Sequence, residues 1–264
     1  MKLAEFKISR YKNVVLPTGG LIFLTFLASK SCKIDFSDFG EGIANGTFFI
    51  AKMFPPDWAA FPEMLQPTFD TILLAFLGTI FGTILSLFVA FFAAANLCNL
   101  WVRNITRSLI SIERSIPELF ILLILITAFG LGAVPAIIAI ALGCVGMLGK
   151  LLADTIEDIP PTLMDSVASI GANKIQIIAF AVMPEIIPNL ISYALFRFEV
   201  NIRLLVLLGA IGAGGIGYEL ENSFSLLEYH RAFSALLIVL VLVFSIERLS
   251  SFFRNKLKNA IVLK

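Results

Sequence analysis

The stretch Asp165-Ser-Val-Ala-Ser-Ile-Gly-Ala-Asn-Lys174, continued by Ile175-Gln-Ile-Ile-Ala-Phe-Ala-Val-Met-Pro184, lies between two long apolar segments. It predicts one short helix that stops at Gly171 and an apolar run that is closed by Pro184. Small side chains on this helix let a neighbouring surface approach closely, and they are Ser166, Ala168 and Ser169. Such a helix suits docking into a groove of another protein. The alternative is that Gly171 and Pro184 only mark a loop between two membrane helices.

Composition places the chain in a membrane. Hydrophobic residues make up 58% of its 264 residues and charged residues 15%. Soluble domains are typically about 45–50% apolar and about one quarter charged, so these values indicate an all-α polytopic membrane protein surrounded by lipid. A net charge of +1 and the absence of a basic block give no reason to expect a nucleic-acid partner.

The apolar runs predict about six transmembrane helices with both termini in the cytoplasm. Residues 96–114 contain three arginines against one acid and are interpreted as a basic loop on the inside. Residues 209–230 contain no Lys or Arg, which assigns them to the outside. The run 119–152 is too long for one crossing and turns at Gly130 to Pro135. The expected parts are an N-terminal transmembrane helix (1–30), a periplasmic loop with an interfacial helix near Trp58 (31–67), a core of five transmembrane helices (68–252) and a cytoplasmic tail (253–264).

Packing between these spans is expected to use small residues. Gly78 and Gly82 are spaced as a small-xxx-small face in the second span, residues 71–95. The short helix around Asp165 falls in the inner loop 160–184, between the fourth and fifth spans.

The fifth span carries polar residues that are costly at membrane depth, namely Arg197, Glu199, Asn201 and Arg203. Glu199 and Arg203 are four residues apart and can pair on one helical face. One interpretation is a self-neutralising pair that holds the helices together. The other is that Arg197 or Arg203 faces a central pathway and attracts an anion, since arginine suits tetrahedral oxyanions.

A glycine-rich segment, residues 209–220, follows this span. Its spacing matches a dinucleotide-binding fingerprint through Gly212, Gly214 and Gly217, but the required strand is missing because a membrane span precedes it. With Gly215, these glycines favour a break in a helix near the outer side of the membrane. The break is interpreted either as a hinge or gate, or as a close-packed turn.

Motifs for catalysis are missing from the sequence. It contains no phosphate-binding loop for ATP, no Gly-x-Ser-x-Gly elbow and no His-Glu-x-x-His pair. One histidine and three widely spaced cysteines predict no metal site. An intramembrane enzyme would therefore have no supporting spacing, and an ATP-independent secondary carrier or channel would leave the segment around Asp165 unexplained.

The spacing of an acid six residues before Gly171 and a proline thirteen after it resembles the cytoplasmic coupling loop of ABC-transporter permeases. The chain departs from the usual Glu-Ala-Ala at Asp165-Ser-Val167 and from the usual ending at Ala181-Val-Met-Pro184. A wider set of segments resembles the permease of phosphonate ABC transporters, which has a MetI-like fold. These are Phe54-Pro-Pro-Asp57, Arg114-Ser-Ile-Pro-Glu118, Gly146-Met-Leu-Gly-Lys150, Ile156-Glu-Asp-Ile159, Tyr193 to Arg203 and Gly212 to Leu220.

This resemblance implies a multi-pass subunit of the inner membrane that forms a homodimer and works with ABC ATPase subunits and a periplasmic phosphonate-binding protein. ATP and Mg would be bound by the ATPase chains, and this chain would hold no cofactor and catalyse no reaction. It implies ATPase coupling through Asp165, Ala168, Gly171, Ala172, Lys174 and Pro184. It implies a translocation pathway and gate at Arg197, Glu199, Asn201, Arg203, Gly212, Gly214, Gly215 and Gly217. A phosphite or phosphate importer is the alternative within the same family.

Overall fold

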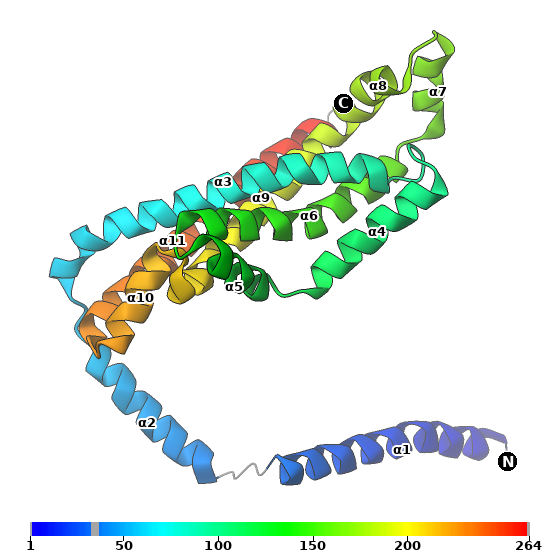
Figure 1. Ribbon diagram of the computed structural model, residues 1–264. Helices are drawn as coiled ribbons and strands as arrows, with labels where there is room; N and C mark the ends of the chain where they lie inside the picture. The colour runs from blue at the N-terminus through cyan, green and yellow to red at the C-terminus, as the bar shows by residue number, and fades with distance from the viewer. Residues whose placement is uncertain (1, 33–36, 263–264) are drawn as a thin grey trace. The chain divides into compact units, whose positions relative to one another are not determined.

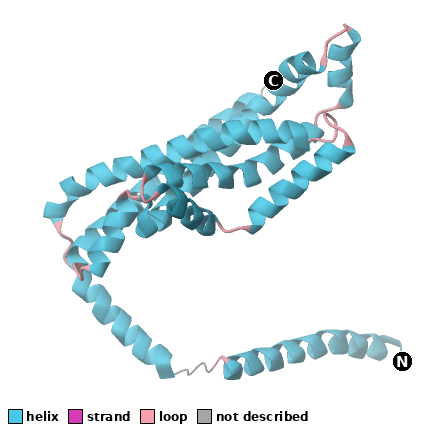
Figure 2. Cartoon of the chain, in the orientation of Figure 1, coloured by secondary structure: helices cyan, strands magenta, loops and turns pink. Residues whose placement is uncertain are grey.

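The computed structural model describes residues 2–32 and 37–262, and these residues form helices and connecting turns without a strand (Figures 1 and 2). They divide into two compact units at Lys52 and Met53. The first unit holds α1 (Lys2–Ser31) and α2 (Ser37–Met53). The sequence predicted a loop over residues 31–67. The structure instead places the 17-residue helix α2 within it.

The second unit is a bundle of long and short helices. Its elements in chain order are a 3-10 turn (Trp58–Ala60), α3 (Phe61–Ala93), α4 (Leu100–Ser115), α5 (Glu118–Phe129), α6 (Ala133–Glu157), α7 (Pro161–Ser169), α8 (Lys174–Ile177), a π-turn (Ile178–Val182), α9 (Met183–Leu208), a second π-turn (Gly209–Ala213), α10 (Ile216–Ser225) and α11 (Tyr229–Val262).

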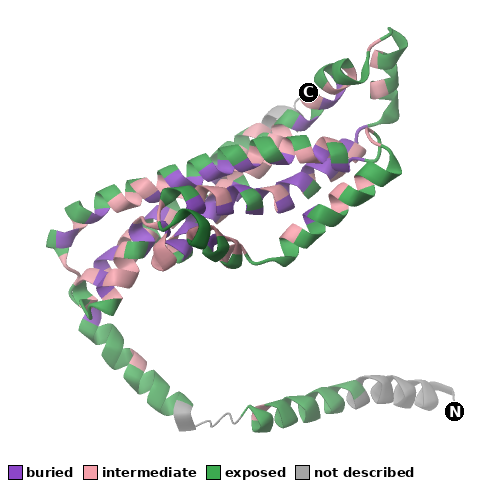
Figure 3. Ribbon diagram, viewed as in Figure 1, coloured by how far each residue is buried: buried purple, intermediate pink, exposed green. Residues whose placement is uncertain are grey.

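The core of this unit lies where α3 and α6 pack together, and α6 carries much of the buried surface (Figure 3). Gly78 and Gly82 face α6, because a Cβ added to either would overlap Ile140 or Cys144. The predicted small-residue packing face is therefore confirmed. The hydroxyl of Ser86 lies 3.1 Å from the carbonyl oxygen of Cys144 and adds a polar contact to the same seam.

Three helices are long and apolar enough to cross a membrane alone, among the described residues. They span Trp58–Ala93, Ala133–Glu157 and Tyr229–Leu257. A fourth candidate is bent by 56°, and it joins Lys174–Ala213 to Ile216–Ser225. The chain is thus an all-α polytopic membrane protein, as its composition indicated.

Two boundaries differ from those expected from sequence. α3 begins at Phe61 rather than near Thr71, because Pro62 sits in its first turn, where proline needs no hydrogen-bond donor. α11 continues from the last apolar span through Val262, so residues 253–262 of the expected tail are helical. Charged residues there do not oppose a helix, since Lys and Arg have good helix propensity.

The interpretation of residues 96–114 as a basic loop was wrong. Residues Leu100–Ser115 form α4, whose N-terminus is capped by the side chain of Asn99, which accepts a hydrogen bond from the Val102 N–H at 3.0 Å. α4 and α5 lie against α6, and the chain bends between them at Ile116 and Pro117. The expected turn at Gly130 to Pro135 is present, because α5 ends at Phe129 and α6 begins at Ala133.

Pro184 does not close the apolar run after Lys174, contrary to the sequence-based expectation. Just before Pro184 the helix contains one π-helical turn, Ile178–Val182, in which the Met183 N–H donates to the Ile178 carbonyl oxygen. Pro184 then occupies the first turn of α9, which tolerates a missing donor. Helical structure consequently runs from Lys174 to Leu208.

Candidate functional site

The segment that opened the sequence analysis forms a projection at one end of the bundle (Figure 1). α7 ends at Ser169, and Gly171 has a φ of +85°, as expected for a glycine that stops a helix. α7 contains no buried residue. Apolar side chains on and after it face outward, with exposed fractions of 84% at Ile170 and 77% at Ile175. Such a projection is suited to contact another molecule.

The predicted coupling residues are distributed over this projection. Asp165, Ala168 and Lys174 are exposed, whereas Ala172 is half-buried. α8 is held at its start by a capping box, in which Asn173 and Gln176 each bond the backbone N–H of the other at 3.0 and 2.8 Å. Pro184 lies beyond the projection, in the first turn of α9.

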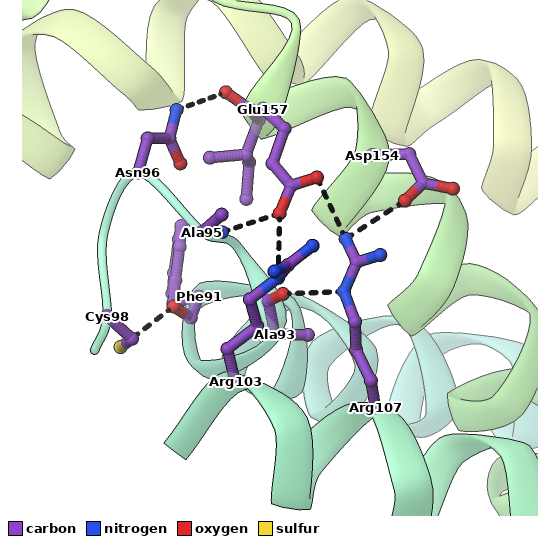
Figure 4. A network of polar contacts seen from close by, with 10 residues as sticks. Phe91, Ala93, Ala95, Asn96, Cys98, Arg103, Arg107, Asp154 and Glu157 are labelled. Carbon is purple, nitrogen blue, oxygen red and sulfur yellow. Dashed lines mark hydrogen bonds and ion pairs between the residues drawn. The ribbon is translucent and has the colours of Figure 1, made fainter. Parts of the chain in front are cut away.

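A network of charges fixes the end of α6 just before α7 (Figure 4). The Glu157 carboxylate accepts the N–H of Ala95 at 2.6 Å and pairs with Arg107 at 3.0 Å and Arg103 at 3.5 Å. Arg107 also reaches Asp154 at 3.1 Å and donates to the carbonyl oxygen of Ala93 at 3.0 Å. This network joins the ends of α3 and α6 to the start of α4.

A second polar cluster lies midway along α6. Arg197 on α9 is 5% exposed, and its guanidinium lies 3.1 Å from the carboxylate of Glu118, the first residue of α5. Glycines of α6 make room for the cluster, because a Cβ at Gly143 would crowd Arg197 and Glu118, and one at Gly146 would overlap Glu113. The structure therefore brings together residues 79 positions apart in the sequence.

The four polar residues of the fifth span point in two directions on α9. Arg197 and Asn201 face α3, α5 and α6, and the Asn201 amide donates to the Thr79 hydroxyl at 2.8 Å. Glu199 instead pairs with Arg203 at 2.5 Å and with Arg254 of α11 at 3.2 Å. The expected Glu199 and Arg203 pair is confirmed, and Arg254 is a partner that the sequence analysis missed.

The glycine-rich segment forms the break in the bent span. Gly212, Gly214 and Gly215 have φ values of +116°, +86° and +73°, which favour glycine. The break is held on both sides, because Gly132 donates its N–H to the Gly212 carbonyl at 3.0 Å and the Ile216 N–H donates to Thr71 at 2.9 Å.

Beside this break, α9 and α10 enclose a pocket of about 580 Å³. Its lining includes Arg203, Gly217, Glu221 and Ser225. Gly217 packs directly on the backbone of Val206, so the first turn of α10 lies against the end of α9 before α10 diverges at the 56° bend. Arg203 is the only positively charged side chain among the described residues of the lining, and its side chain is 45% exposed. The described residues contain no group of three His, Cys, Asp or Glu side chains that could hold a metal ion.

Residues 82–259 match the family described as binding-protein-dependent transport system inner membrane component. The chain belongs to this family. A member of the binding-protein-dependent transport family is a membrane-embedded permease subunit rather than an enzyme, and this agrees with the bundle of long apolar helices.

Named relatives of this permease handle phosphorus compounds. It is 32% identical over 219 residues to the phosphite transport system permease protein PtxC of Stutzerimonas stutzeri, covering 83% of this chain and 80% of PtxC. It is 33% identical over 211 residues to the phosphate-import permease protein PhnE of Mycolicibacterium smegmatis, covering 78% of this chain and 39% of that protein.

The fold of the permease is also found in a solved structure of the MetNI methionine ABC transporter in inward-facing conformations. The similarity covers 76% of this chain and 99% of that chain, with a TM-score of 0.67 and 20% sequence identity. The expected MetI-like fold is thereby confirmed.

Proposed function

We propose that this permease is the membrane subunit of an ATP-binding-cassette importer that moves a phosphorus oxyanion, such as a phosphonate or phosphite, across the inner membrane. The named relatives support this substrate class, because they are phosphite and phosphate permeases. ATP and Mg would be bound by separate ATPase subunits, while a second copy of this chain and a periplasmic binding protein complete the complex. The chain itself would hold no cofactor.

The observation that carries this proposal is the α7 projection, which exposes apolar residues on a helix without a buried residue. We assign its contact to the ATPase subunit. Asp165, Ala168, Gly171, Ala172 and Lys174 would shape that contact, with Pro184 at the base of the following helix. Glu157 and its arginines would transmit the motion of the projection to α3 and α4, because they join these helices immediately before α7.

The glycine break serves as the gate in this proposal. Gly212, Gly214, Gly215 and Gly217 permit the 56° bend between α9 and α10, and small changes there would alter the adjacent pocket. Arg203 would attract the anion in this pocket through charge-assisted hydrogen bonds. Arg197, Glu199 and Asn201 would hold α9 in register with its neighbours through the contacts described above.

The charges at the two ends of the bundle support a cytoplasmic position for the end that carries α7, and we propose that both termini lie on that side. Arg103 and Arg107 pair with Glu157 and Asp154 at the end of α6, just before α7. Glu63 and Glu219 pair with Arg231 at the start of α11, which lies near the other end. Positively charged loops favour the cytoplasmic side, so α7 would face the ATPase.

Reconstitution tests this proposal. The complex of this permease with its ATPase and binding protein is placed in liposomes, and uptake of labelled phosphite, methylphosphonate and phosphate is measured with and without ATP. We expect ATP-dependent uptake of at least one compound, and the three rates identify the preferred oxyanion. Uptake by the permease alone, without the ATPase, would instead establish a secondary carrier.

A further inference from the structure

α4 and α5 together follow α6 along its length. Arg107 pairs with Asp154 near the end of α6, Glu113 lies against Gly146, and Glu118 lies against Gly143. Gly146 lies 13 residues after Ala133, the first residue of α6, and 11 residues before Glu157, its last. At about 1.5 Å per residue it lies roughly 20 and 17 Å from the two ends, near the middle of this span. The end of α4 therefore lies beside the middle of this membrane-crossing helix.

α4 presents three different faces. One face packs on its neighbours through Arg103, Arg107 and the buried Ile110. A second face is apolar and outward, with Trp101, Ile105, Leu109 and Ile112 exposed by 59 to 78%. This stripe suits lipid.

The third face of α4 is polar and exposed. It consists of Asn104, Ser108, Ser111 and Ser115, whose spacing of four, three and four residues makes one continuous line. The hydroxyls of Ser111 and Ser115 donate to the carbonyl oxygens of Arg107 and Ser111 at 2.8 and 2.9 Å. A hydrated pathway would also offer hydrogen bonds to the Asn104 amide and the Ser108 hydroxyl, which lipid does not. We call this line the hydroxyl face.

Arg114 stands at the end of α4, adjacent to the hydroxyl face. It is exposed, and its Cγ packs where a Cβ on Gly146 would sit. Among the described arginines that belong to the second unit, all but two form ion pairs with carboxylates, and these paired residues are Arg103, Arg107, Arg197, Arg203, Arg231 and Arg254. Arg248 stacks on Phe244, which leaves Arg114 without an ion-pair or ring partner in the described structure. An ionisable residue at this depth requires a polar environment.

We propose that the hydroxyl face of α4 lines the hydrated translocation pathway and that Arg114 contacts the transported oxyanion halfway across the membrane. This rests on the proposed transport function and adds a cation that is separate from Arg203. Arg114 has no carboxylate within 4.0 Å of its guanidinium among the described ion pairs, while the Glu113 carboxylate lies beside the same glycine, Gly146. A guanidinium outside an ion pair keeps its donors available for phosphoryl oxygens. The bend at Ile116 and Pro117 places it at the junction of the two half-helices, where ion sites of transporters are favoured.

Thiol accessibility tests the location without any transport measurement. Ser108, Ser111 and Ser115 are changed singly to Cys in the assembled transporter, after Cys32→Ser, Cys98→Ser and Cys144→Ala remove the natural thiols. Methanethiosulfonate reagents with charged ends react with hydrated thiols, so we expect all three positions to be modified. Leu109→Cys and Ile112→Cys are the matched controls on the apolar face and should stay unmodified. The pathway assignment would be overturned if the cysteines at the three serine positions were as unreactive toward the reagents as those at the two control positions. A spontaneous disulfide between two copies at position 111 would also overturn it.

The charge of Arg114 is tested by comparing an anionic with a cationic reagent at Ser111→Cys. Arg114 is three residues from Ser111, so the two side chains are neighbours on the helix surface. Removing its positive charge should lower the ratio of the anionic to the cationic reaction rate about threefold to fivefold in Arg114→Gln. Arg114→Lys should restore it. An unchanged ratio in Arg114→Gln would show that the guanidinium does not act on anions in the pathway.

The same variants are then assayed for phosphite uptake. Arg114→Gln should lower uptake at least tenfold while ATP hydrolysis and complex yield persist, and Arg114→Lys should recover part of it. Uptake at the unmodified level in Arg114→Gln would overturn the contact with the oxyanion. If the unmodified complex transports no phosphorus oxyanion, the proposed function fails, whereas the reagent ratio still tests the role of Arg114.

Discussion

The carboxylate of Glu199 on α9 lies 3.2 Å from the guanidinium of Arg254 on α11, in addition to its pair with Arg203. The Glu199 side chain is 7% exposed, so one buried acid pairs with two arginines. This contact anchors the last helix to the bent span, and it changes what substitutions at Glu199 are expected to do.

Glu199→Gln is expected to destabilise the bundle by about 1–3 kcal/mol, because it removes the charge that pairs with two guanidinium groups whose side chains are 45% and 25% exposed. Thermal unfolding of the purified complex in detergent measures the effect. Glu247→Gln is the matched control, since Glu247 lies 3.9 Å from Arg203 with a side chain that is 54% exposed, and it should change stability by less than about 1 kcal/mol. Equal effects of the two substitutions would contradict the central role of Glu199.

Sequence reasoning predicted the features that depend on neighbouring residues. The stop at Gly171, the helix break at the glycine-rich segment, the Glu199 and Arg203 pair and the packing of Gly78 and Gly82 were all visible as short spacings. Each depends on residues within one or two helical turns, or on the φ angle of a single glycine.

The features that sequence reasoning missed depend on distant partners. α4 was taken for a loop because its arginines interrupt the apolar pattern, yet Arg107 is neutralised by Asp154, 47 positions away. The contact of Arg197 with Glu118 and that of Glu199 with Arg254 likewise join different helices. A single sequence contains no signal for such pairs, although an acid and a proline at the start of an apolar run could have directed attention to Glu118.

Arg203→Met is expected to abolish oxyanion uptake while leaving assembly intact, because Arg203 supplies the positive charge of the pocket between α9 and α10. Uptake by reconstituted complexes and their yield after size-exclusion chromatography measure the two properties. Arg203→Lys keeps the charge and should retain part of the activity. If Glu199 and Arg203 serve only packing, replacing both with apolar residues should preserve uptake, provided that Arg254 is replaced as well.

Gly171→Trp is expected to uncouple ATP hydrolysis from uptake. A Cβ at Gly171 meets no atom within 4 Å, so the permease should fold, although a φ of +85° adds strain of about 1–2 kcal/mol. The added ring would change the surface that α7 presents to the ATPase. The number of ATP molecules hydrolysed per oxyanion imported should rise severalfold, and Gly171→Ala should have a much smaller effect. Unchanged coupling in Gly171→Trp would argue against contact between α7 and the ATPase.

Glu157→Gln is expected to weaken the network that joins α3, α4 and α6. The substitution removes a charge that pairs with Arg103 and Arg107 and accepts the Ala95 N–H, so we expect a loss of about 1–3 kcal/mol. Proteolysis of the turn at residues 94–99 in the assembled complex should become faster. Asp154→Asn is the control, because Asp154 is 45% exposed and contacts only Arg107 among the described ion pairs. A cleavage rate in Glu157→Gln that equals the control would count against this role.

Gly212→Ala should impair the gate more than Gly214→Ala. Both glycines have positive φ angles, so both substitutions introduce backbone strain of about 1–2 kcal/mol. Only at Gly212 would the new Cβ also collide with the side chain of Leu131, whereas Gly214 faces open space. Leu131 lies in the turn between α5 and α6. The collision would push that turn away from the break and lengthen the hydrogen bond from the Gly132 N–H to the Gly212 carbonyl oxygen.

Uptake rates of the two variants, normalised to complex yield, separate the effect of the collision from that of the shared backbone strain. Restoration of Gly212→Ala by Leu131→Ala would confirm that this contact limits the gate, and failure of that rescue would assign the loss to backbone strain alone.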